Sequence, residues 1–172
     1  MFRKLPYSIL LFVLLILQLF IFDKLMISML VAPVVYITFI LLLPMDRSQL
    51  SMLMWGAAVG LLFDLLTGMA GVNSIATILL SYLRIWLLTA TLGRDMIQLG
   101  IAPLPRAVGW GKFLLYMSLG VLFHLTTLFV VESLRFDQLD FLLRRVICSG
   151  LISTLFAVLI AVQFENLLAR RR

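Results

Sequence analysis

The stretch that decides the fold runs from Gly60 to Arg84 and reads GLLFDLLTGMAGVNSIATILLSYLR. It is almost entirely apolar, yet it carries a carboxylate at Asp64 and a guanidinium at Arg84. An ionised carboxylate near the centre of a membrane-spanning helix costs about 2.5–3.5 kcal/mol on insertion scales, so Asp64 needs specific partners. Glycines at positions 60, 68 and 71 surround the acid, which indicates close helix packing and a turn beside it.

The whole chain has the composition of a membrane protein. Of its 172 residues, 63% are hydrophobic, and its mean hydropathy is +1.16. A soluble domain is only about 45–50% apolar. Five uncharged runs are 18 to 21 residues long, and they cover residues 5–22, 25–45, 65–83, 113–131 and 146–164. A spanning helix needs about 20 residues, and runs that are continuous rather than alternating exclude a transmembrane barrel.

These runs predict an all-α membrane protein, with residues 1–172 forming a single integral-membrane domain. We expect one bundle of six transmembrane helices, at approximately residues 5–22, 26–44, 49–67, 71–90, 112–131 and 146–165. No small-residue cleavage site follows the first run, so we expect it to be an uncleaved anchor.

The basic residues predict the orientation. With six spans and the N-terminus inside, nine Lys and Arg residues lie inside, four lie outside and Arg84 lies within a span. The four outer ones are Lys24, Arg135, Arg144 and Arg145. Cytoplasmic loops carry the excess of Lys and Arg, which places both termini in the cytoplasm. The net charge of +6 is therefore not interpreted as a nucleic-acid signal, and we expect the basic tail ARRR at 169–172 to contact anionic lipid.

Helical spacing gathers the polar and small residues into a seam. On the third predicted helix one face carries Gly56, Gly60, Asp64 and Gly68, each four residues from the next. After Gly71, the fourth helix carries a polar stripe of Asn73, Ser74, Thr77, Ser81 and Arg84. Lipid would not tolerate this stripe, so we expect it to face the bundle interior. The fifth helix places Lys112, Tyr116, Gly120, His124 and Thr127 on one face. The sixth has a small-residue row at Ser149, Ser153, Ala157 and Ala161.

A direct ion pair between Asp64 and Arg84 is not the preferred reading. If the chain turns near residue 69, the two lie ~8 Å and ~22 Å below the outer end at 1.5 Å per residue. We expect Asp64 to cap backbone N–H groups at the Gly68–Asn73 turn. Arg84 is expected to snorkel toward the inner interface, which Tyr82 and Trp86 mark. A buried pair reached by distortion remains the alternative.

The sequence offers little for catalysis. It has one His and one Cys on different predicted helices, whereas a zinc site needs several such ligands. Only Asp64 is an acid at membrane depth, and no phosphate-binding glycine motif is present. We therefore expect no enzymatic activity, no cofactor and no metal, and we interpret His124 and Cys148 as interior packing residues.

The chain resembles the rod shape-determining protein MreD family. The resemblance is strongest in GLLFDLLTGMAGVNSIA, residues 60–76, where the family has a G-x-x-x-D-x-x-x-G segment followed by Gly and a small or polar run. Supporting stretches are LQLFIFDKL at 17–25, APVVYITFILLLP at 32–44 and SYLR at 81–84. Residues 93–172 match in hydropathy alone.

The resemblance implies a function that composition does not show. Members of this family are multi-pass proteins of the bacterial inner membrane that work with the periplasmic scaffold MreC and the cytoskeletal MreB. Together they organise peptidoglycan elongation, including the glycosyltransferase RodA and a class B penicillin-binding protein. The resemblance carries over no catalytic residue, no cofactor and no small-molecule substrate.

An alternative comes from another class of protein. Substrate-binding S components of energy-coupling vitamin transporters are six-helix proteins of similar size, and MreD is similar to them in fold. S components dock their transporter through an Ala-xxx-Ala pattern on the first helix. Here the first helix reads ILLFVLLILQLFIF and has no small residue between Ser8 and Asp23, which favours the scaffold.

The outer segment 132–145, ESLRFDQLDFLLRR, carries Phe136, Leu139 and Leu143 on one helical face, with charges over much of the rest. This pattern favours a short interfacial helix on the outer leaflet, with a solvated loop as the alternative. As the largest outer element, it is also the candidate surface for a periplasmic partner.

Overall fold

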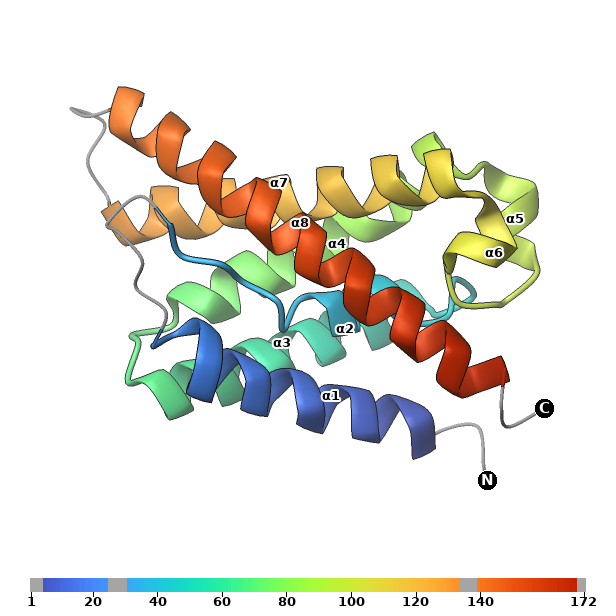
Figure 1. Cartoon of the computed structure of the whole chain (residues 1–172), viewed down its shortest axis with the longest axis horizontal. Helices are drawn as coiled ribbons and strands as arrows, with labels where there is room; N and C mark the ends of the chain where they lie inside the picture. The colour runs from blue at the N-terminus through green and yellow to red at the C-terminus, as the bar shows by residue number, and fades with distance from the viewer. Residues whose placement is uncertain (1–4, 25–30, 134–138, 170–172) are drawn as a thin grey trace.

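The computed structural model describes residues 5–24, 31–133 and 139–169, and it is all-helical (Figure 1). The first helix, α1 (Leu5–Leu17), continues as a π-helical turn, η1 (Gln18–Phe22), and is followed later by the short helix α2 (Thr38–Leu42). Two long helices, α3 (Gln49–Thr67) and α4 (Val72–Thr91), form a hairpin. The short helices α5 (Arg94–Gln98) and α6 (Pro105–Val108) lead to α7 (Trp110–Ser133) and α8 (Leu139–Ala169).

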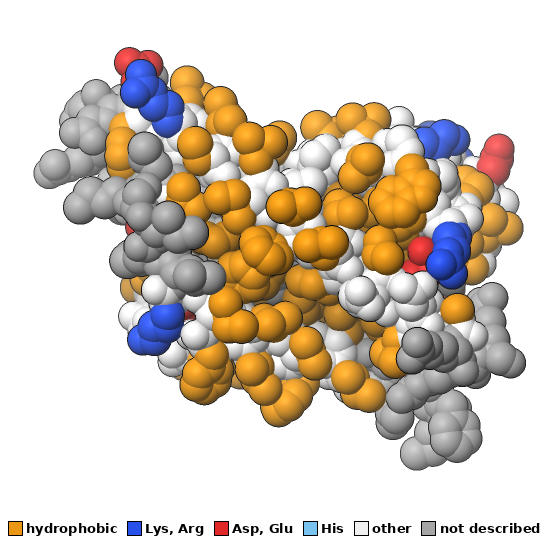
Figure 2. Space-filling view, viewed as in Figure 1, with side chains coloured by type: hydrophobic (Ala, Val, Ile, Leu, Met, Phe, Trp, Pro, Cys, Tyr) orange, Lys and Arg blue, Asp and Glu red, His pale blue; other side chains and the backbone are white. Residues whose placement is uncertain are grey.

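Four helices are long and apolar enough to cross a membrane. They are α3, α4, α7 and the Asp140–Ala169 part of α8, and the 16 residues from Tyr7 to Phe22 form a shorter apolar helix. Hydrophobic side chains cover the middle of the visible face, and charged ones lie toward its two ends (Figure 2). In Figure 1, α1 begins and α8 ends at the same end of the bundle. This protein is therefore a membrane protein.

The helix predicted for residues 26–44 is wrong over its described part. Residues 31–37 are not helical, and only the five residues of α2 are α-helical. Pro33 disfavours a helix on the N-terminal side of the segment and Pro44 on its C-terminal side, because proline lacks an N–H and disfavours the helical conformation of the residue before it. Leu43, which precedes Pro44, ends α2 with φ −58° and ψ 150°. Among the described residues, the structure thus has four helices of spanning length in place of the predicted six.

Residues 31–45, which we call the crossing segment, pass through the bundle between its two ends. At one end the N–H of Ala32 donates to Oγ of Ser149, near the start of α8, over 3.0 Å. At the other, the N–H of Met45 donates to the carbonyl of Ile101, between α5 and α6, over 3.0 Å. Residues 33–43 are all buried. The crossing segment takes the place of the second predicted helix.

Side chains from the surrounding helices replace the hydrogen bonds that a helix would have made. The N–H of Val34 donates to Oγ of Ser153 over 2.8 Å, and the N–H of Val35 donates to the Gln18 side-chain oxygen over 2.7 Å. Nε2 of Gln18 donates in turn to the carbonyl of Pro33 over 3.1 Å. Irregular backbone is tolerated at membrane depth only where the protein itself satisfies it.

The segment between α7 and α8 also differs from the prediction. A short interfacial helix over 132–145 is not formed as a separate element, because α7 runs to Ser133 and α8 already begins at Leu139. No glycine or proline interrupts Leu139–Arg145, so this stretch forms the first turns of α8. Phe136 lies outside the described residues.

Helices α3 and α4 approach closely where α3 carries its glycines. A Cβ atom added at Gly60 would lie 2.6 Å from Cα of Ser74, and one added at Gly56 would lie 2.3 Å from Oγ of Ser81. Contacts under about 3 Å force a shift, and at Gly60 the obstacle is backbone, which cannot rotate away. The predicted packing role of these glycines is confirmed.

We expect Gly60→Ala to destabilise the protein by about 1–3 kcal/mol, the usual cost of overpacking. The matched control is Gly111→Ala on α7, where an added Cβ meets no atom within 4 Å. Thermal unfolding of the detergent-solubilised protein should show a lower midpoint for the first variant only. Equal midpoints would contradict the close packing of α3 on α4.

We also expect the turn between α3 and α4 and the end of α5 to face opposite sides of the membrane. Single cysteines at Met69 and Leu99, both exposed, test this in a Cys148→Ser background. In intact cells an impermeant thiol reagent should label the first and spare the second. Labelling of both, or the reverse pattern, would overturn the orientation predicted from the basic residues.

Candidate functional site

Two clusters of buried polar groups lie in the core, one around Asp64 and one around Arg84. The Asp64 cluster contains Asp64, Asn73, Ser74, Thr77, Tyr36 and His124. The Arg84 cluster contains Arg84, Tyr116, Met52 and the carbonyls of Leu41 and Leu43. All these residues are buried.

Asp64 caps the start of α4. It is 4% exposed, and one of its oxygens accepts from the N–H and Nδ2 of Asn73, both over 3.0 Å. Its other oxygen accepts from the N–H of Ser74 over 2.9 Å and from the Ser74 hydroxyl. The N-cap residue, Gly71, has no side chain for this task, and a negative charge at a helix N-terminus is also favourable electrostatically. The predicted cap is confirmed, with Asn73 and Ser74 as its donors.

The turn beneath Asp64 depends on two glycines with positive φ. Gly68 ends α3 at φ 69°, and Gly71 precedes α4 at φ 86°. Only glycine adopts such a conformation without steric cost. This geometry places the Asn73 and Ser74 N–H groups opposite the carboxylate.

Tyr36 extends the Asp64 cluster into the crossing segment. Its hydroxyl lies 3.3 Å from Oδ1 of Asn73, 3.2 Å from Oγ1 of Thr77 and 3.3 Å from Nε2 of His124. Its ring stacks on Phe63 at a centroid distance of 4.4 Å. The cluster therefore joins α3, α4, α7 and the crossing segment, and His124 takes part in it as a hydrogen-bonded interior residue.

Arg84 does not snorkel to the interface, so this prediction is wrong. Its side chain is in the core, and the whole residue is 2% exposed. Nε donates to the Tyr116 hydroxyl over 3.1 Å, and one terminal nitrogen donates to the carbonyls of Leu41, over 3.3 Å, and Leu43. Tyr116 also donates to the Leu41 carbonyl, over 2.9 Å.

The broken helix explains why Arg84 turns inward. The last carbonyls of a helix have no partner within it, and α2 ends inside the bundle. Arginine offers five N–H donors in a fixed plane and suits several acceptors at once. Arg84 thus stabilises the end of α2, and it forms no ion pair with Asp64. Tyr82 and Trp86 are both exposed on the outer surface of α4.

The predicted seam is mostly buried, but in the structure most of its polar residues belong to two separate clusters, one around Asp64 and one around Arg84. Eight of its ten residues are buried: Gly56, Gly60, Asp64, Asn73, Ser74, Thr77, Ser81 and Arg84. Gly68 is exposed and Gly71 is half-buried, because both lie in the turn. In the candidate partner surface, Leu143 is exposed, Phe136 lies outside the described residues, and the structure describes only the backbone of Leu139.

Sequence reasoning did not assign the roles of Gln18, Tyr36 and Tyr116. Each is a polar group within an otherwise uncharged run, and the prolines at 33 and 44 bracket the backbone that they help to hold. Polar groups within uncharged runs, together with these two prolines, were the sequence evidence for a buried non-helical segment. In the ranges 5–24, 31–133 and 139–169, no three His, Cys, Asp or Glu side chains are close enough to hold a metal ion.

Comparison with known proteins adds no assignment, since no family model, curated protein or solved structure matches this chain.

We expect Asp64→Leu to lower the stability of the folded protein by about 1–3 kcal/mol, because it leaves buried donors without an acceptor. Asp64→Asn keeps one acceptor oxygen and should be milder. Asp95→Leu, which removes an exposed acid from the first turn of α5, is the control. The thermal unfolding midpoint in detergent ranks the three variants. If the Asn and Leu variants are equally damaged, the charge and not the hydrogen bonding is what matters.

Proposed function

We propose that this protein is a non-enzymatic scaffold of the bacterial cell-elongation machinery in the inner membrane, as the resemblance to MreD implies. The observation that supports this most is the role of the Gly60–Gly68 motif. The residues that carry the resemblance also hold the bundle together: Gly60 sets the α3–α4 contact and Asp64 caps α4.

The use of the buried polar groups agrees with a scaffold. Asp64 accepts from its own chain, Arg84 donates to its own chain, and Ser149 and Ser153 hold the crossing segment. Polar side chains at membrane depth otherwise mark ion or substrate paths. Here they are used for internal support, which leaves recognition of partners to the outer surface.

In the proposed arrangement the chain crosses the membrane six times, with both termini in the cytoplasm. The crossings are α1–η1, the crossing segment, α3, α4, α7 and α8. The end that carries α5 and α6 faces MreB and the cytoplasm. The end where α7 meets α8 faces MreC, and RodA and the class B penicillin-binding protein are reached within the same complex.

We expect Leu143→Glu to weaken co-purification with a tagged MreC homologue by about fivefold or more, as when an apolar interface contact worth over ~1 kcal/mol is lost. Leu99→Glu is the matched control, because Leu99 is similarly exposed (59% against 56%) on α5 at the opposite end. Both variants should insert at normal abundance.

Unchanged recovery of the Leu143 variant would remove the start of α8 from the interface. Failure of the unmodified protein to co-purify with MreC would overturn the scaffold proposal. Recovery with the ATP-binding subunits of a vitamin transporter would identify an S component instead.

A further inference from the structure

The lipid-facing side of α7 and α8 carries an apolar groove with a volume of about 390 Å³. Three of its lining residues are small, namely Ser118, Gly150 and Thr154, and the others, such as Leu122, Ile147 and Leu155, are larger. A volume of this size is typical of a site for a small ligand, about 300–1,000 Å³.

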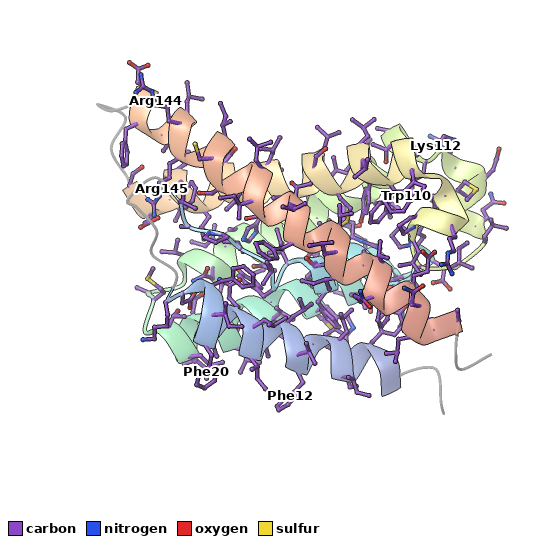
Figure 3. All side chains as sticks on the ribbon, in the orientation of Figure 1. Phe12, Phe20, Trp110, Lys112, Arg144 and Arg145 are labelled. Carbon is purple, nitrogen blue, oxygen red and sulfur yellow. The ribbon has the colours of Figure 1, made fainter. Side chains whose placement is uncertain are left out.

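Two charged side chains lie between the groove and the start of α8, on the face of α8 that lines the groove. Asp140 and Arg144 are four residues apart, and Arg144 is three residues before Ile147, so helical spacing puts all three on neighbouring parts of one face. Both charged residues are exposed, and they are not within ion-pair distance of each other. Figure 3 shows Arg144 at the start of α8 with its side chain directed away from the bundle.

Arg144 differs in this respect from its neighbour Arg145. Arg145 pairs with Glu132 over 3.1 Å and lies over the ring of Phe129 at 4.1 Å. Within the described part of the chain, Arg144 has no hydrogen bond, ion pair or ring contact, so its charge is open to a ligand.

The length of the groove matches one leaflet of a bilayer. Along α8 it extends from Ile147 to Val158, which is about 16 Å at 1.5 Å per residue. Half of a hydrocarbon core that is about 30 Å thick is about 15 Å. A lipid with its head group at Arg144 would therefore place one acyl chain along the whole groove.

We propose that this groove binds a phospholipid with a primary-amine head group, phosphatidylethanolamine. One acyl chain fills the groove, the phosphate binds Arg144 and the ammonium group binds Asp140. A cation and an acid one turn apart complement a zwitterion. A purely anionic head group would meet repulsion from Asp140, and an apolar partner helix would leave both charges without a complement.

Native mass spectrometry of the full-length protein tests the proposal. The protein is released from nanodiscs that contain equal amounts of phosphatidylethanolamine and phosphatidylglycerol with identical chains. The unmodified protein should retain the ethanolamine lipid preferentially. Arg144→Gln should reduce retention of that lipid roughly twofold to fivefold, the effect of losing one exposed ion pair. Asp140→Asn should remove the preference or reverse it.

A substitution that fills the groove distinguishes lipid bound in this groove from lipid bound elsewhere on the surface. Ser118→Phe should abolish retention of both lipids, whereas Leu119→Phe, at an exposed position on another face of α7, should not change it. Arg94→Gln, at the opposite end of the bundle, is the charge control. A preference for phosphatidylglycerol in the unmodified protein, or full retention by the Arg144 or Ser118 variant, would overturn the proposal. Lipid-free dimers that Ser118→Phe disrupts would show that a second copy occupies the groove instead.

Discussion

The structure depends on one constraint: backbone that is not helical must have its hydrogen bonds satisfied by protein when it lies at membrane depth. The crossing segment is buried and largely non-helical, so its backbone needs hydrogen-bond partners. Side chains of η1, α4, α7 and α8 supply them. Gln18 and Ser153 supply acceptors for its N–H groups, while Arg84 and Tyr116 supply donors for its carbonyls. The requirement explains why four separate helices, η1, α4, α7 and α8, each keep a polar side chain that faces the crossing segment.

Asp64 and Arg84 each satisfy the backbone at one end of a helix, and the two helix ends have opposite polarity. Asp64 is a negative group at the N-terminus of α4, and Arg84 is a positive group at the C-terminal carbonyls of α2. Each is favoured by the local helix dipole as well as by its hydrogen bonds. Since Arg84 itself belongs to α4, this helix is capped at its start and then serves as the cap for another. A displaced α4 would therefore release the crossing segment as well.

The sequence allowed some of these features to be predicted because they are local. The position of Asp64, nine residues before Asn73 with glycines between them, specified the turn and the cap, and the four-residue glycine spacing specified the α3–α4 contact. The break at residues 31–37 was missed because hydropathy is the same for an apolar helix and a buried extended segment. Pro33 and Pro44 were the local evidence against a helix. The role of Arg84 could not be predicted before that break was known, since its acceptors exist only because α2 ends at Leu42.

Asp64, Arg84 and Ser153 bond to groups of their own chain, so under the proposed function recognition of other molecules is left to the outer surface. In a membrane, apolar surface alone gives helices little reason to associate, because lipid tails are equally apolar. Specific recognition then requires shape, or charge at the interfaces. The start of α8 offers both, with exposed Leu143 and Arg144 at the end of the groove. A protein partner would thus contact Leu143 and a lipid would contact Arg144, the next residue of α8. A head group bound at Arg144 would form part of the surface that the partner contacts. The two proposals can still be separated, since Ser118 lies within the groove and away from the head-group end, and its substitution alters lipid retention without changing Leu143.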